Sequence, residues 1–166
     1  MRKLKWSATA LAAAFLLSAP LPAATQGLKV QDPLAQARQA SPRAQRALLT
    51  AVERAGERLV AVGERGTVLT SDDQGQSWTQ RPSPVSVMLT NLRFADARKG
   101  WAVGHSGVVL HTADGGLSWK KQLDGTALAQ VMLQDARALP GEVSERAVRE
   151  AEQLVSDGPD KPLLDL

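Results

Sequence analysis

A gap-free internal repeat constrains this chain more than any other feature of its sequence. Residues 61–78 and residues 102–119 align at an offset of 41, and 10 of the 18 aligned positions are identical. Both copies begin Ala-Val-Gly-x-x-Gly-x-Val-Leu and end Asp-x-Gly-x-Ser-Trp. A period of this size is typical of architectures in which each unit buries its apolar face against a neighbouring unit. The chain is therefore expected to contain stacked, similar units.

Within each copy, short apolar runs alternate with Gly- and Asp-containing turns, a pattern that predicts antiparallel strands. The runs lie at 48–53, 59–62, 67–70 and 78–81, and again at 89–94, 101–103, 108–112 and 119–123. Four short strands in about 40–45 residues are typical of a propeller blade. We predict a mainly β fold, with an extended lead-in over 25–46 and two four-stranded blades over 47–124.

The last turn of each copy fits the pattern Ser/Thr-x-Asp-x-Gly-x-Ser/Thr-Trp. The aspartate can accept hydrogen bonds from backbone amides that follow it, and the glycine supplies the left-handed backbone of a tight turn. The Trp ring can then pack beneath the turn. We predict structural roles for Ser71, Asp73, Gly75, Ser77 and Trp78, and for Thr112, Asp114, Gly116, Ser118 and Trp119.

These turns resemble the Asp-box (BNR) repeat of β-propellers. The segment Phe94-Ala95-Asp96-Ala97-Arg98-Lys99-Gly100-Trp101-Ala102-Val103-Gly104, with the turn after it, is similar to the photosystem II assembly/stability factor family and its exported bacterial relatives. The resemblance covers residues 45–124 and implies rings of several blades that bind protein partners, with the Asp-box residues forming the fold. Two repeats are visible here, which predicts a partial propeller truncated from a larger one.

Catalysis is not expected. Asp-box sialidases use a Tyr nucleophile, and this chain has no Tyr. A hydrolase that uses a pair of carboxylates would have to take them from Asp72, Asp73 and Asp114, but two of these aspartates already have structural roles in the predicted turns. We predict no catalytic residue and no cofactor. The alternatives are a carbohydrate-binding or glycosidase-like Asp-box protein, or a nonfunctional truncated remnant.

No metal site is predicted either. The chain has no Cys, which excludes zinc-thiolate sites and disulfides, and its two histidines, His105 and His111, lack supporting carboxylates at ligand spacing. Three basic residues, Arg93, Arg98 and Lys99, precede Trp101 and form a candidate basic patch for an acidic partner or a lipid headgroup. The alternative for this patch is an ordinary set of solvated strand ends.

The first 24 residues have the layout of an export signal. A basic start is followed by an uncharged apolar run over 6–17 and by small residues near Ala24, and the run is too short to span a membrane. Removal of residues 1–24 leaves 17 basic and 17 acidic residues, so the net positive charge belongs to the signal and no nucleic-acid partner is expected. We predict a periplasmic or secreted protein with no transmembrane segment in its mature form.

After Gly125 the pattern changes to that of helices. We expect a helical insertion over 125–158, broken at Pro140-Gly141, with Ser144 capping the second helix, and the start of an incomplete further blade over 159–166. The predicted function is protein–protein interaction in the assembly or stability of an envelope membrane complex, as the family resemblance implies. A complete two-blade chain would either self-associate or remain marginally stable.

Overall fold

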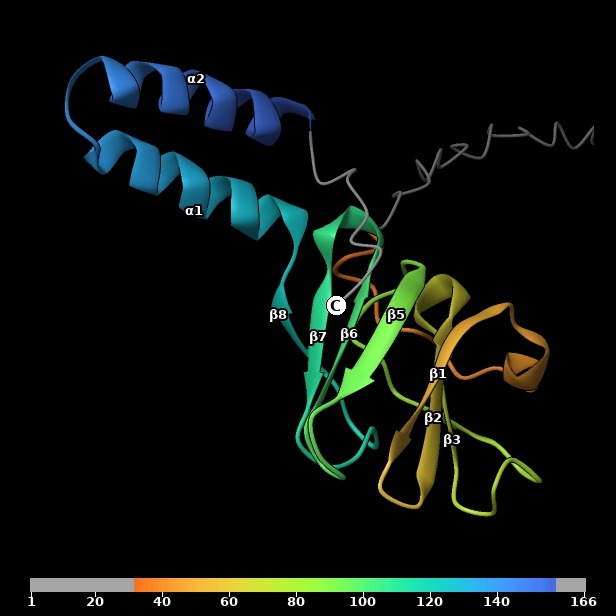
Figure 1. The fold of residues 1–166 in the computed structure, drawn as a ribbon. Helices are drawn as coiled ribbons and strands as arrows, with labels where there is room; N and C mark the ends of the chain where they lie inside the picture. Colours follow the sequence, from red (N-terminus) through yellow and green to blue (C-terminus); the bar gives the residue numbers. More distant parts are fainter. Residues whose placement is uncertain (1–31, 158–166) are drawn as a thin grey trace, which may run out of the picture. The chain divides into compact units, whose positions relative to one another are not determined.

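The computed structural model describes residues 32–157, and within them eight strands form two four-stranded antiparallel sheets (Figure 1). The predicted signal peptide and the predicted further blade over 159–166 lie outside the described residues. The first sheet has the order β1 (Leu49–Ala55), β2 (Arg58–Gly63), β3 (Val68–Ser71), β4 (Thr79–Arg81). The second has the order β5 (Leu89–Phe94), β6 (Gly100–Gly104), β7 (Val109–Thr112), β8 (Lys120–Leu123).

Each sheet is a meander in which every strand pairs with the strand that follows it in sequence. The repeat offset of 41 is also a structural equivalence, because Val60 pairs with Thr70 in the first sheet and Trp101 pairs with His111 in the second. The predicted strands and the predicted fold class, two blade-like sheets with a C-terminal helical segment, are confirmed.

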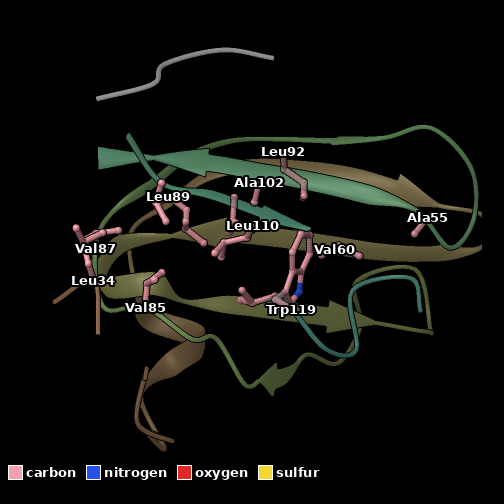
Figure 2. Close-up of a cluster of buried hydrophobic side chains, with 13 residues drawn as sticks. Leu34, Ala55, Val60, Val85, Val87, Leu89, Leu92, Ala102, Leu110 and Trp119 are labelled. Carbon is pink, nitrogen blue, oxygen red and sulfur yellow. The ribbon is translucent and has the colours of Figure 1, made fainter. Parts of the chain in front are cut away.

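The two sheets stack through one face of each (Figure 2). Side chains on alternate positions of a strand point to opposite faces, so Val60 and Val62 lie on one face of β2 while Ala61 lies on the other. The buried cluster between the sheets contains Val60, Val62 and Val68 from the first sheet and Leu92, Ala102, Leu110 and Trp119 from the second half of the chain. We call these two surfaces the stacking faces.

The lead-in covers the opposite face of the first sheet. The short helix η1 (Ala44–Arg46) contributes Ala44 to a second buried cluster, which also contains Ala61 and Leu69 and has Trp78 packed against it. Gln80 on β4 fixes the lead-in, because its side chain accepts a hydrogen bond from the Ser41 amide (2.8 Å) and donates one to a lead-in carbonyl.

Two helices follow the second sheet, α1 (Gly125–Ala138) and α2 (Gly141–Asp157). The Asp124 carboxylate caps α1 by accepting a hydrogen bond from the Ala127 amide (2.8 Å). The prediction that Ser144 caps the second helix is wrong: α2 begins three residues earlier, and the Ser144 hydroxyl donates to the Ala136 carbonyl of α1 instead (2.9 Å). Among residues 32–157, no helix has the length and apolarity needed to cross a membrane.

Candidate functional site

The first Asp-box turn connects β3 to β4 and is closed by the Asp73 carboxylate. Its Oδ1 accepts hydrogen bonds from the Ser71 hydroxyl (2.7 Å) and the Ser77 amide (2.8 Å), and its Oδ2 accepts one from the Ser77 hydroxyl. The Ser71 oxygen in turn accepts from the Gly75 amide at 2.8 Å. Each side-chain oxygen of the motif therefore has a partner inside the turn.

The second Asp-box turn, between β7 and β8, repeats this network. Asp114 accepts hydrogen bonds from the Thr112 hydroxyl (2.8 Å), the Ser118 amide (2.9 Å) and the Ser118 hydroxyl, while Thr112 accepts from the Gly116 amide at 3.0 Å. In both turns the Trp indole N–H donates to the carbonyl of the motif glycine at 3.1 Å, Trp78 to Gly75 and Trp119 to Gly116.

The two Asp-box carboxylates are held in their ionised form. Hydrogen bonds from the Ser77 hydroxyl and amide, and from Ser71, lower the pKa of Asp73 to about 2. Burial raises the pKa of Asp114, but the hydrogen bonds from Ser118 and Thr112 together outweigh burial and hold this pKa below its ordinary value. A carboxyl group with a lowered pKa is a poor proton donor at neutral pH, and its oxygens here already serve the turns.

The third candidate carboxylate, Asp72, forms an ion pair with Arg58 (2.6 Å), the first residue of β2. The same guanidinium also donates long hydrogen bonds to the carbonyls of Asp114 (3.4 Å) and Gly115 (3.3 Å). Arg58 thus links the Asp-box turn of the second sheet to the first sheet, a role that the sequence analysis missed.

The predicted basic patch is divided in the structure. Arg93 lies on β5, where its guanidinium pairs with Glu53 of β1 at 3.2 Å. Arg98 and Lys99 lie in the turn before β6, where the backbone amide of each donates a hydrogen bond to the Asp96 carboxylate (2.8 and 2.7 Å). Together with Ala113, these two residues line a shallow depression. A partner-binding role for these three residues stays a prediction.

The two histidines lie apart, as strand alternation indicates. His105 is exposed in η3 (His105–Gly107), while His111 lies on β7 with its ring centroid 5.0 Å from that of Trp101. Within residues 32–157, three or more His, Cys, Asp or Glu side chains nowhere gather in a way that could hold a metal ion.

One face of the second sheet carries an aromatic and cationic row, which we call the Trp101 face. Arg93, Trp101, His111 and Lys120 are successive cross-strand neighbours, so their side chains share the face opposite the stacking face. Trp101 and His111 are half-buried and the two cationic residues are exposed. The Trp101 indole N–H donates to the Gln122 side-chain carbonyl at 3.0 Å, which holds the ring along the sheet.

The sequence analysis named Trp101 and His111 but did not place them together. The signal that could have done so is the pairing of the two apolar runs across the Gly104 turn, which sets the positions of Trp101 and His111 opposite each other. That pairing follows from the turn length, because a hairpin turn fixes the register of its strands.

Comparison with known proteins finds similar chains among the solved structures. No family model matches the sequence, and no curated protein matches it. A solved structure described as "YCF48 bound to D1 peptide" is 28% identical with a TM-score of 0.44, covering 54% of this chain and 30% of that chain. This chain therefore spans less than one third of that protein's length, and the assignment of two blade-like sheets rests on their own topology.

Proposed function

We propose that this chain is an exported, non-enzymatic protein of the β-propeller type that binds a protein partner, in support of the assembly or stability of an envelope membrane complex. The Asp-box carboxylates support a structural rather than a catalytic role, because their oxygens are engaged within the turns. The membrane-complex setting comes from the family resemblance of residues 45–124.

The Trp101 face is the observation that carries the binding role. Aromatic residues, Trp among them, and Arg are enriched in protein–protein interfaces, and Trp, Tyr and Arg in their energetic centres. Here a Trp and a His lie side by side on a sheet face between two exposed cationic residues. An aromatic centre with a charged rim suits a protein surface of complementary shape and charge.

Capture from solubilised envelope membranes tests this role. The full chain is immobilised beside a Trp101→Ser variant and a control variant, Val52→Ser, which removes an exposed apolar side chain from the first sheet (62% exposed). We expect one set of membrane proteins to be captured by the wild type and the control and lost with Trp101→Ser. Elution by free sugars, glycosidase turnover, or equal capture by all three chains would contradict the proposal.

Export is tested separately by the N-terminus of the mature protein. Expression of the full chain in a Gram-negative host should yield a periplasmic protein that begins at or near Thr25, because the small residues around Ala24 form the cleavage region. Intact-mass measurement of the periplasmic and cytoplasmic fractions gives the answer. Retention of Met1 on the mature protein would exclude the proposed signal.

A further inference from the structure

A polar cavity of about 340 Å³ lies between the lead-in and the turn that joins β2 to β3. We call it the lead-in cavity. Its wall contains Arg65 of the short helix η2 (Glu64–Gly66), Ser86 of the segment between the two sheets, and four consecutive lead-in residues. The lead-in residues are Gln36, Ala37, Arg38 and Gln39. Cavities that bind small molecules measure about 300–1,000 Å³, so this one suits a small group.

Backbone hydrogen bonds fix the lead-in wall of this cavity. The Arg38 amide donates to the Ser83 carbonyl (2.9 Å), and the Ser86 amide donates to the Pro33 carbonyl (2.8 Å). The lead-in is therefore tied at two points to the segment that precedes β5. A wall that is already held in place loses little conformational freedom when a ligand binds.

The opposite wall is fixed by close packing. A Cβ atom built on Gly66 would lie 2.1 Å from the Val85 carbonyl oxygen, so the η2 backbone lies directly on the segment that carries Ser86. Val85 and Val87 are buried in the cluster between the sheets (Figure 2), whereas Ser86 between them is half-buried and lines the cavity. Arg65 and Ser86 are thus held next to each other.

Two arginines line the lead-in cavity, and neither charge is paired. Among residues 32–157, the guanidinium groups of Arg38 and Arg65 form no ion pair and no hydrogen bond. The Nε atom of Arg38 is buried in this state. A buried donor without a partner costs free energy, so this side chain gains by turning its Nε–H towards an acceptor in the cavity.

The acidic residues nearest to these arginines in sequence are used elsewhere. Asp32 accepts a hydrogen bond from the Leu34 amide (2.9 Å), and Glu64 accepts one from the Leu48 amide (3.3 Å). Neither carboxylate lines the cavity. The other lining residues are neutral: Gln36, Ala37, Gln39 and Ser86. The two arginines therefore give the lining an uncompensated double positive charge, surrounded by neutral hydrogen-bond donors.

Arg65 has a backbone conformation that is uncommon for residues other than glycine. Its φ of 52° and ψ of 35° lie in the left-handed region. The matching turn of the second sheet has the same conformation at Ser106 (φ 59°), so the turn requires this backbone but not a guanidinium. Arg38 precedes the repeat and has no counterpart in it. The lead-in cavity is therefore not a feature that the two repeats share.

We propose that the lead-in cavity binds the phosphate group of a phosphate monoester. Such a group has a charge of about −1.5 to −2 at neutral pH and three acceptor oxygens, which matches two arginines better than the single charge of a carboxylate does. Arg38 and Arg65 bind these oxygens from the two walls, and the Ser86 hydroxyl donates to them between the arginines. This site is distinct from the Trp101 face and does not depend on the proposed function.

Titration of the full, nitrogen-15-labelled chain with inorganic phosphate tests the site by nuclear magnetic resonance. We expect saturable shifts of the Arg38 Nε–H and of the Arg65 and Ser86 amides. Arg38→Gln and Arg65→Gly should each weaken binding about tenfold, because each removes a charged donor. Glycine suits the positive φ at position 65, so Arg65→Gly should remain folded.

Two controls make the titration specific. Arg43→Gln removes the same charge from an exposed lead-in position outside the cavity and should change the affinity by less than about twofold. Acetate offers one charge and two oxygens and should bind about tenfold more weakly than phosphate. The absence of saturable shifts with phosphate, an equal loss with Arg43→Gln, or equal affinity for acetate would overturn the proposal.

Two further probes distinguish a free ester from a lipid headgroup. Glycerol phosphate is the soluble ester, and phosphatidylcholine vesicles that contain phosphatidic acid present the same group on a membrane. Competition by glycerol phosphate, with vesicle binding unaffected by Arg65→Gly, identifies a free ester. Vesicle binding that is lost with Arg65→Gly and retained with Arg43→Gln identifies a lipid headgroup. Failure of both probes to depend on Arg38 and Arg65 would contradict a phosphate monoester as the ligand.

Discussion

At the scale of single residues, the Asp-box turns depend on two carboxylates with nearly identical partners. Asp73 and Asp114 each accept three hydrogen bonds, from donors two residues before and four residues after them, and a glycine with positive φ lies two residues after each, with φ of 93° at Gly75 and 85° at Gly116. Charge-assisted hydrogen bonds are stronger than neutral ones, which explains why an aspartate and not an asparagine suits this position.

Asp114→Asn should destabilise the chain by about 1–3 kcal/mol, because the amide replaces an ionised acceptor and cannot accept from both Ser118 groups as the carboxylate does. Urea unfolding followed by circular dichroism measures this change. The matched control is Asp135→Asn on the exposed surface of α1, which should shift the unfolding midpoint little. Equal effects of the two substitutions would show that the turn network is not what stabilises the sheet.

Acid should destabilise the chain through the same groups. The folded-state pKa values of Asp73 and Asp114 lie below the ordinary value of 3.8, so the ionised forms stabilise the fold above the unfolded pKa, and this contribution is lost as pH falls through the folded pKa. Thermal midpoints should therefore be flat near neutral pH and fall from about pH 4 towards pH 2. The double variant Asp73→Asn/Asp114→Asn should show a shallower fall; an unchanged slope would contradict this account.

At the scale of elements, the eight strands could be predicted because turn residues and apolar runs are local signals. Four-residue runs between Gly and Asp turns place each strand to within a few residues, and the Asp-box pattern predicts its own hydrogen bonds. The N-terminus of α2 was missed because the Ser144 hydroxyl bonds to a carbonyl of α1, a tertiary contact that no local pattern contains. The Arg58 link to the second Asp-box turn was missed for the same reason.

The two Asp-box Trp residues have the same local role but different burial. Trp119 is 6% exposed between the sheets and meets Phe94 edge to face at 6.3 Å, whereas Trp78 is half-buried beside the lead-in. Trp119→Ala should cost about 3–5 kcal/mol, the usual range for a buried aromatic side chain, and Trp78→Ala should cost less. Calorimetric unfolding of both variants measures the difference. A larger loss for Trp78→Ala would contradict the assigned burial.

At the scale of the whole molecule, the stacking of the two sheets explains why equivalent positions of the two repeats have different neighbours and different burial. Each unit has the same motif, yet among residues 32–157 only the second Asp-box turn lies on another sheet, and Val60 of the first sheet is buried while its counterpart Trp101 is half-buried. This asymmetry could not be predicted from the repeat, because identical motifs have different neighbours at the two ends of a stack.

Gly75→Ala and Gly116→Ala form a matched pair for this stacking. Both glycines have positive φ, so both substitutions incur about 1–2 kcal/mol of backbone strain. A Cβ at Gly75 would lie 3.7 Å from the nearest atom, in ordinary contact, whereas at Gly116 it would press on Val60 and add about 1–3 kcal/mol of overpacking. Chemical denaturation should rank Gly116→Ala as clearly less stable than Gly75→Ala, and equal losses would argue against the stacked arrangement.

The nuclear Overhauser spectrum of the full, isotope-labelled chain tests the central claim most directly. The claim is that the second sheet stacks on the first through Gly116 and Val60, while no sheet of the described part of the chain, residues 32–157, packs on the Trp101 face. The account predicts strong cross-peaks between the Val60 methyl groups and both Gly116 Hα and the Trp119 ring, with Trp101 ring cross-peaks confined to its own sheet, chiefly His111 and Gln122. Absence of the Val60–Gly116 cross-peaks in a folded chain would contradict it.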